Sequence, residues 1–161
     1  MTLEEYYRTY HVPKKSLIHD NIDSTLSVTL TDGVAIPFPC TPDAYEYNTD
    51  NWTSWNPETS TFHDSIDDAL VFPKFSLQGE GAKGVFVYVY VYIPHPQLGN
   101  QLVAEMKDTL AKNNVSERLE FNTWCYNGAE IDAKTYGFYT ECEAVGGDVA
   151  LTASSVGIAV I

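Results

Sequence analysis

The fold is decided by the stretch Gly84-Val85-Phe86-Val87-Tyr88-Val89-Tyr90-Val91-Tyr92-Ile93. Its valines alternate strictly with aromatic residues, and a β-strand imposes this period of two because successive side chains leave opposite faces of the pleat. Valine and the aromatic residues are also favoured on that surface. We therefore predict a central strand. Its tyrosine side packs either in the core or against another subunit, since aromatic residues are common in both places.

A second periodicity follows this strand. Leu98, Leu102, Met106 and Leu110 recur every four residues, with Val103 beside them, which predicts an amphipathic helix over residues 97–112. Alternating segments and turn residues predict strands around it, with a hairpin turn at Asp32-Gly33 and a short helix over residues 60–70. The expected strands cover residues 26–30, 34–36, 71–77, 119–126, 136–142 and 149–161.

The predicted fold class follows from this order of elements. It is α+β: a mainly antiparallel sheet or flattened barrel with the amphipathic helix packed on one face. A β-sandwich with a single helix is the alternative. The length of 161 residues predicts one domain over residues 1–161, with an N-terminal arm over residues 1–20 that docks on a neighbour or forms a helical turn.

Residues 40–62 show neither helical nor strand periodicity and predict a long loop, which in a compact domain is often functional. Its aromatic side chains lie among polar ones, a composition typical of contact surfaces. In the alternative interpretation, Trp52 and Trp55 fasten the loop to its own core. Together with the tyrosine ladder, this loop supplies the predicted interface residues: Tyr45, Tyr47, Trp52, Trp55, Tyr88, Tyr90 and Tyr92.

The charge excludes two classes of partner. Nine Lys and Arg residues stand against 22 Asp and Glu residues, a net charge of −13, which opposes binding to nucleic acids and to anionic membranes. Residues 16–73 hold ten of the acidic residues and no Lys or Arg. This segment either keeps the protein soluble or forms an acidic docking surface for a basic partner.

The N-terminus has no charged and apolar signal sequence, so we expect synthesis in the cytoplasm without a signal peptide. Three cysteines without CxxC spacing, Cys40, Cys125 and Cys142, predict reduced and buried thiols.

No set of residues points to catalysis or to a cofactor. His63, Asp64, Asp67 and Asp68 are the densest group of potential metal ligands, but acidic residues are favoured in a first helical turn by the helix dipole alone. Cys125 lies in an alternating apolar segment, which is typical of a core cysteine and not of a nucleophile. The phosphate, dinucleotide, zinc-protease and serine-hydrolase motifs are missing from the sequence. We predict no catalytic residue, no metal and no cofactor, and hence a protein that is not an enzyme.

Three functions are compatible with these features. The preferred one is a structural subunit of a larger assembly, such as a head, tail or connector component of a virion or phage particle, which acts through protein–protein contacts with other subunits, including copies of itself. The second is an acidic inhibitor or immunity-type protein that covers a basic site. The third is a small sugar-binding module or enzyme built on the tyrosine ladder.

Overall fold

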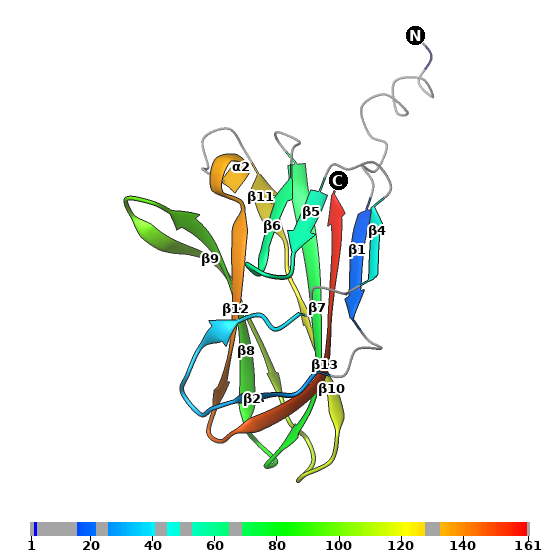
Figure 1. Cartoon of the computed structure of the whole chain (residues 1–161), viewed down its shortest axis with the longest axis vertical. Helices are drawn as coiled ribbons and strands as arrows, with labels where there is room; N and C mark the ends of the chain where they lie inside the picture. Colours follow the sequence, from blue (N-terminus) through cyan, green and yellow to red (C-terminus); the bar gives the residue numbers. More distant parts are fainter. Residues whose placement is uncertain are drawn as a thin grey trace.

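Two antiparallel sheets face each other in the computed structural model of the chain (Figure 1). The structure describes residues 2, 16–21, 26–40, 45–48, 53–64, 69–127 and 133–160. The elements are β1 (Ser16–Asn21), β2 (Val28–Leu30), β3 (Ile36–Pro37), β4 (Tyr45–Asn48), β5 (Thr53–Asn56), β6 (Thr61–Asp64), β7 (Ala69–Gly81), β8 (Phe86–His95), β9 (Gly99–Thr109), β10 (Glu117–Asn122), β11 (Cys125–Asn127), the four-residue helix α2 (Ala133–Tyr136), β12 (Phe138–Val145) and β13 (Val149–Val160).

The first sheet has the order β10-β7-β13-β1-β4, with β11 paired to β7 and β2 paired to β13. The second sheet has the order β5-β6-β12-β8-β9, with β3 paired to β12. Within them, β1-β13-β7-β10 lies opposite β6-β12-β8-β9, and the chain passes between these two layers in the sequence typical of an eight-stranded jelly roll. Additional short strands extend the edges.

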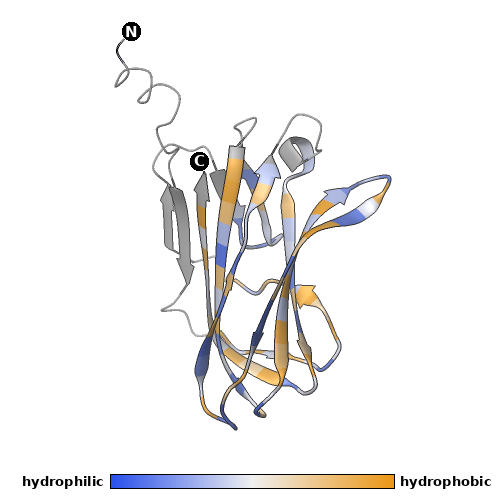
Figure 2. Cartoon of the chain, turned by 180° about the vertical axis from the view of Figure 1, so that it is seen from behind, coloured by the Kyte–Doolittle hydropathy of each residue, from blue (hydrophilic) through white to orange (hydrophobic). Residues whose placement is uncertain are grey.

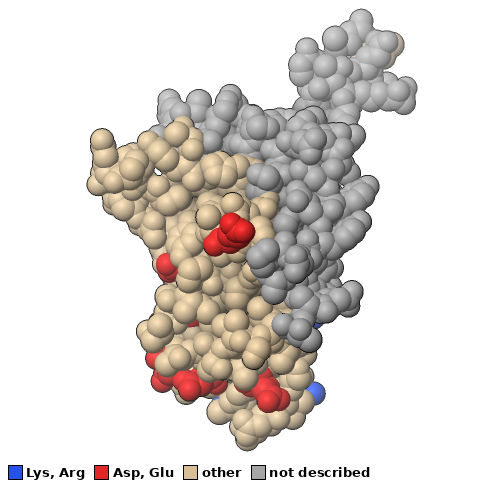
Figure 3. Space-filling view, in the orientation of Figure 1, with Lys and Arg blue, Asp and Glu red and all other residues tan. Residues whose placement is uncertain are grey.

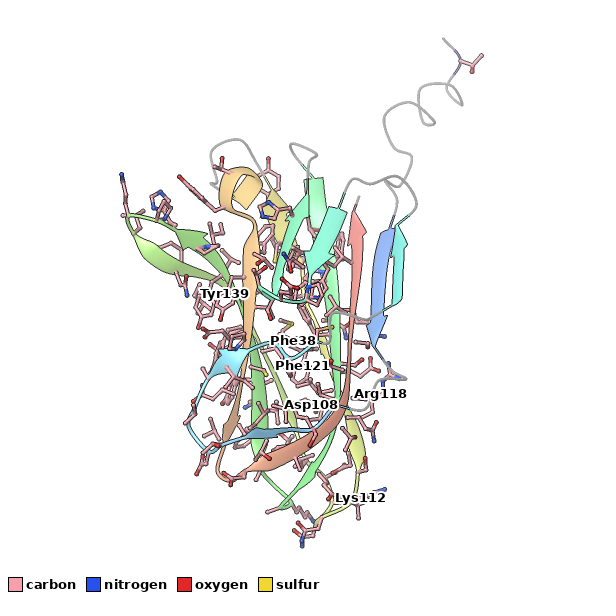
Figure 4. The ribbon with its side chains drawn as sticks, in the orientation of Figure 1. Phe38, Asp108, Lys112, Arg118, Phe121 and Tyr139 are labelled. Carbon is pink, nitrogen blue, oxygen red and sulfur yellow. The ribbon has the colours of Figure 1, made fainter. Side chains whose placement is uncertain are left out.

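Alternation along each strand divides core from surface. In β8, Val87, Val89 and Val91 are fully buried, while the tyrosines between them are half-buried. From the first sheet, Phe75 and Phe121 pair across β7 and β10 and point into the same core, and Figure 4 shows Phe121 and Phe38 between the two sheets. Figure 2 shows the resulting alternation of apolar and polar residues along the described strands.

The predicted α+β class is wrong, because the segment expected to form its helix is a strand. Residues 99–109 form β9, which pairs antiparallel with β8 over its whole length. The alternative, a β-sandwich with a single helix, agrees with the two layers. Its expected helix over residues 97–112 is absent, and the four-residue α2 is the one helix among the described residues. None of these residues forms a helix long and apolar enough to cross a membrane.

A bulge in β9 explains why the four-residue spacing was misleading. Positions i and i+4 share a side in a strand as well as in a helix, so Met106 and Leu110 both face the core, 8% and 1% exposed. The register then shifts: Ala104 pairs with Val91, but Leu102 pairs with Tyr92. Val103 is the additional residue in β9. Because of it, the side chains that precede it in the strand, beginning with Leu102, lie on the other face of the sheet. Leu102 is consequently 52% exposed.

Three further expectations are corrected. Asp32-Gly33 does not close a hairpin, because β2 pairs with β13 in one sheet and β3 pairs with β12 in the other. The turn instead carries the chain between the layers, with Gly33 at a φ of 74°. The segment 40–62 is not a structureless loop, since it contains β4 and β5 and enters β6. The helix expected over residues 60–70 is replaced by β6 and β7 in its described part.

The other strand predictions are confirmed in position. Residues 71–77 lie in β7, 119–126 in β10 and β11, 136–142 largely in β12, and 149–160 in β13. The strand expected to be central, β8, is in fact next to the sheet edge formed by β9. Part of the expected N-terminal arm is ordered, because Ser16–Asn21 pairs with β13; most of residues 1–15 lie outside the described part.

Candidate functional site

The outer side of the second sheet carries a row of aromatic and acidic side chains, which we call the tyrosine face. Antiparallel pairing with register Tyr139–Tyr92, Glu141–Tyr90 and Glu143–Tyr88 joins β12 to β8, and Tyr90–Glu105 joins β8 to β9. Residues paired in this way share one side of a sheet. The tyrosine face consists of Phe86, Tyr88, Tyr90, Tyr92, Leu102, Glu105, Lys107, Tyr139, Glu141 and Glu143.

Its aromatic rings contact one another in a continuous line. Tyr88 and Tyr90 stack with ring centroids 5.8 Å apart and ring planes 2° apart. Tyr92 continues the row at 6.1 Å from Tyr90, and Tyr139 on the next strand stacks at 6.4 Å from Tyr92. Figure 4 places Tyr139 on the side of its sheet away from the core phenylalanines. The result is an apolar surface four rings long that is only partly exposed to water.

Burial, and after it the neighbouring carboxylates, raise the pKa values of these phenols. The Tyr90 hydroxyl donates to Glu143 Oε2 at 2.9 Å, and its pKa is raised by desolvation, by this hydrogen bond and by the nearby carboxylate charges. Burial and Glu141 raise the pKa of Tyr139 to about 12. The pKa of Tyr92 is raised first by desolvation and then by Glu141. The face therefore offers neutral tyrosine hydroxyls at neutral pH.

The charge on the face is mainly negative. Three carboxylates, of Glu105, Glu141 and Glu143, stand against the ammonium of Lys107, which lies 4.6 Å from the centre of the Phe86 ring. The described ion pairs join Lys74 and Arg118 to Glu120 on β10, in the other sheet. Within the described residues, none of the three carboxylates on the tyrosine face has an ion-pair partner. Figure 3 shows the same excess of acidic over basic side chains on another view of the surface.

The structure brings together only part of the predicted interface. Tyr88, Tyr90 and Tyr92 lie side by side on the tyrosine face, whereas Tyr45 and Tyr47 belong to β4 at the edge of the first sheet. Trp52 lies outside the described residues.

Trp55 occupies the core instead of the surface. It is 4% exposed, with ring centroids 6.3 Å from Phe38, 6.4 Å from Phe62 and 6.3 Å from Phe75. This position favours the alternative in which its indole fastens the segment to its own core, so we leave it out of the candidate site.

Five residues of the face were not singled out from the sequence: Glu105, Lys107, Tyr139, Glu141 and Glu143. The signal for three of them is local, because Tyr139, Glu141 and Glu143 alternate with the buried residues Thr140, Cys142 and Ala144. The sequence does not reveal that this strand pairs with β8.

A cleft of about 400 Å³ opens beside the tyrosine face, between β9 and the turn that joins β10 to β11. Phe138 and Cys125 line its buried part, and Val103 and Trp124, which are 42% and 61% exposed, lie toward solvent. The β8–β9 hairpin projects from the body of the sandwich next to it (Figure 1). The cleft is mostly apolar, and its one charged lining residue is Glu105.

The remaining candidates give no catalytic site. His63 lies in β6, while Asp67 and Asp68 fall outside the described part; within that part no three His, Cys, Asp or Glu side chains are grouped to hold a metal. Desolvation raises the pKa of the Cys125 thiol to about 12 and that of Cys142 still further from its ordinary value. Both are buried free thiols, protonated at neutral pH and therefore poor nucleophiles.

Comparison with known proteins identifies the fold and no family. Neither a protein-family model nor a curated protein matches the sequence. Among solved structures, the chain is similar to Eiger TNF from S. frugiperda, with a TM-score of 0.60 and 10% identity over 93% of this chain and 94% of that one. A match of this kind shows a shared jelly-roll fold and does not transfer function.

A second match is a chain of naturally occurring empty particles, the top component, of cowpea mosaic virus. Its TM-score is 0.34 and its identity 15%, over 91% of this chain and 82% of that one. The two structures do not superpose well enough for this match to support an argument.

Proposed function

We propose that the chain is a non-enzymatic structural subunit of a larger protein assembly, and that the tyrosine face is one of its contacts with a neighbouring subunit. The observation that carries this proposal is the continuous row formed by Tyr88, Tyr90, Tyr92 and Tyr139 on the outside of the sandwich. Contiguous aromatic surface is unfavourable on an isolated soluble domain and is typical of contact sites.

The physical properties of the face suit a permanent contact. Its rings are already ordered by stacking and by the hydrogen bond from Tyr90 to Glu143, so association costs little side-chain entropy there. Tyrosine also combines a large apolar area with a hydroxyl that tolerates a wet rim. Leu102, moved onto the same side by the bulge, extends the apolar area toward the β8–β9 hairpin.

The proposed setting is a virion or phage particle. The jelly roll is a fold that viral capsid proteins use, although lectins and cupins use it too. The sequence adds few Lys residues, many Tyr, Thr, Asn and Asp residues, and a terminal strand that is apolar to its end. Fold and composition together support this setting by analogy, and the contact surface is the part of the proposal that rests on geometry.

Light scattering on the full chain in low and in high salt tests the proposal. The aromatic part of the contact does not depend on unscreened charges, so the oligomer persists in high salt even if charge pairs at the contact are weakened. We expect a defined oligomer in both conditions. A monomer in both conditions, at concentrations well above those of a cell, would contradict the proposal.

One observation favours a second candidate, an acidic inhibitor. The three carboxylates of the face have no ion-pair partner among the described residues, and a basic site on another protein would complement them. In that case the isolated chain is a monomer that captures a basic protein in low salt and releases it in high salt.

A sugar-binding role receives less support from the ring geometry. Sugars stack on the flat face of an exposed aromatic ring, whereas Tyr88 and Tyr90 are stacked against each other. One face of each of these rings is therefore turned toward the other ring, which leaves less flat ring surface for a sugar.

A further inference from the structure

We propose that the tyrosine face binds the N-terminal segment of a second copy of the chain, residues 3–15, which lie outside the described part of the structure. This inference rests on the proposed assembly function and names the occupant of its contact. It follows from the charge of the face, from the composition of the segment and from the position at which the segment joins the fold.

The tyrosine face carries three carboxylates against one cation, Lys107. A cation from the N-terminal segment of the second copy would complement this excess of negative charge. Glu141 and Glu143 are half-buried, and Glu143 already accepts from the Tyr90 hydroxyl, yet each carboxylate has further lone pairs to offer. Lys74 and Arg118 pair with Glu120 on the other sheet, and the cation of the face itself, Lys107, lies over the Phe86 ring and is in no described ion pair. Two copies that joined their tyrosine faces directly would oppose carboxylates to carboxylates, which is unfavourable.

The N-terminal segment has the complementary composition. Residues 6–15 contain Arg8, Lys14 and Lys15 and no Asp or Glu, whereas the rest of the chain holds six Lys and Arg residues against 22 Asp and Glu residues. The segment also contains Tyr6, Tyr7 and Tyr10. With Glu4 and Glu5 at its start, the whole segment of residues 3–15 has a net charge of +1 (three cations minus two carboxylates), and its basic and aromatic side chains lie together in residues 6–15.

This chemistry matches the face at the level of single groups. A guanidinium stacks on tyrosine rings and forms paired hydrogen bonds with a carboxylate, and a lysine ammonium binds carboxylates as a point charge. Glu141 and Glu143 on β12 lie opposite Tyr90 and Tyr88 on β8, so the face offers both kinds of partner side by side.

The attachment point favours a neighbour over the same molecule. Residue 15 is followed directly by β1, which belongs to the first sheet, while the tyrosine face is the outer side of the second sheet. The segment therefore starts on the opposite layer of the sandwich from its own face. Thirteen extended residues span at most about 45 Å, enough to cross to an adjacent subunit. When a segment of one copy binds a different surface of the next copy, repetition of this contact builds a closed ring or an open filament.

Carbodiimide cross-linking of mixed-isotope assemblies tests the inference. Unlabelled and ¹⁵N-labelled full chains are unfolded and refolded together, and the reagent then joins amines to carboxylates that are in contact. We expect peptides that link Lys14 or Lys15 to Glu141, Glu143 or Glu105, with one labelled and one unlabelled member. Links within single isotopes only would mean that the segment binds its own molecule, and absence of these links would mean that another occupant fills the face. Either result overturns the inference.

Charge exchange in the full chain provides a second measurement. Replacing Arg8→Glu, Lys14→Glu and Lys15→Glu together is expected to weaken association by about tenfold or more, and adding Glu141→Lys and Glu143→Lys is expected to restore it. The control replaces Lys83→Glu and Lys112→Glu, which lie at turns away from the face, and is expected to leave association unchanged. Failure of the exchange to restore association would contradict the inference.

These results separate the two proposals. An assembly of unchanged mass without links from the segment to the face rejects this inference and leaves the proposed function standing. A chain that is monomeric before any substitution rejects both.

Discussion

At the scale of single residues, burial decides the role of Trp55. Its indole packs among Phe38, Phe62 and Phe75, so Trp55→Ala removes a large core side chain and is expected to lower the free energy of unfolding by about 3–5 kcal/mol. The control, Trp124→Ala, affects a side chain that is 61% exposed and should change it by less than about 0.5 kcal/mol. Urea unfolding measures both. Trp55→Ala with full stability but weakened association would show that this indole is a contact residue after all.

Tyr139 makes a pH-dependent contribution to stability. Burial and Glu141 raise its pKa from the ordinary 10.0 to about 12 in the folded protein. Since the folded pKa is the higher one, the stabilisation is fully present below about pH 10 and is lost as the pH rises through about 12. The absorbance of tyrosinate, compared between wild type and Tyr139→Phe, isolates this titration.

The same comparison in the Glu141→Gln background provides the control. We expect the difference curve to move to lower pH there, because a neutral amide repels a phenolate less than a carboxylate does. A wild-type difference curve centred near the ordinary tyrosine pKa would contradict the described environment of Tyr139.

At the scale of elements, β9 shows where local pattern is ambiguous. Apolar residues four positions apart share a side in both a helix and a strand, and only the pairing with β8 decides between them. The bulge at Val103 separates Leu102, 52% exposed, from Leu110, 1% exposed, and Leu98, 68% exposed, lies in the turn before β9. Sequence reasoning had no local signal for this bulge, because it depends on the strand opposite.

The two leucines therefore respond differently to truncation. Leu110→Ala is expected to lower the free energy of unfolding by about 2–5 kcal/mol, and Leu98→Ala by less than about 0.5 kcal/mol. A helix over residues 97–112 would bury both and make both costly. Chemical denaturation of the two variants distinguishes these cases, and equal large losses would contradict the strand.

At the scale of the whole molecule, the sequence predicts strands better than their arrangement. The alternation in residues 84–93 identifies β8 and its buried valines because a period of two is a local property. The tyrosine face needs β12 beside β8, and the bonded pair Tyr90 and Glu143 is 53 residues apart in the chain. A single sequence carries no record of that pairing, so half of the candidate site was visible and half was not.

The same limit applies to the charge. Counting residues showed an excess of acidic groups but not that Glu141 and Glu143 stand on the outer side of one strand between aromatic rings. Only the folded chain shows that an acidic and aromatic surface lies on one layer and that the basic N-terminal segment begins on the other.

Sedimentation velocity of Tyr88→Thr/Tyr90→Thr beside wild type shows whether the tyrosine face is a subunit contact. Threonine preserves the preference for a strand and removes two rings of the row, while Trp124→Thr removes an exposed aromatic side chain outside it. If the tyrosine face is a subunit contact, we expect an oligomer for wild type and Trp124→Thr, and a monomer with nearly unchanged melting temperature for the double variant. A double variant that keeps the full oligomeric mass would contradict the assignment of the tyrosine face as a subunit contact.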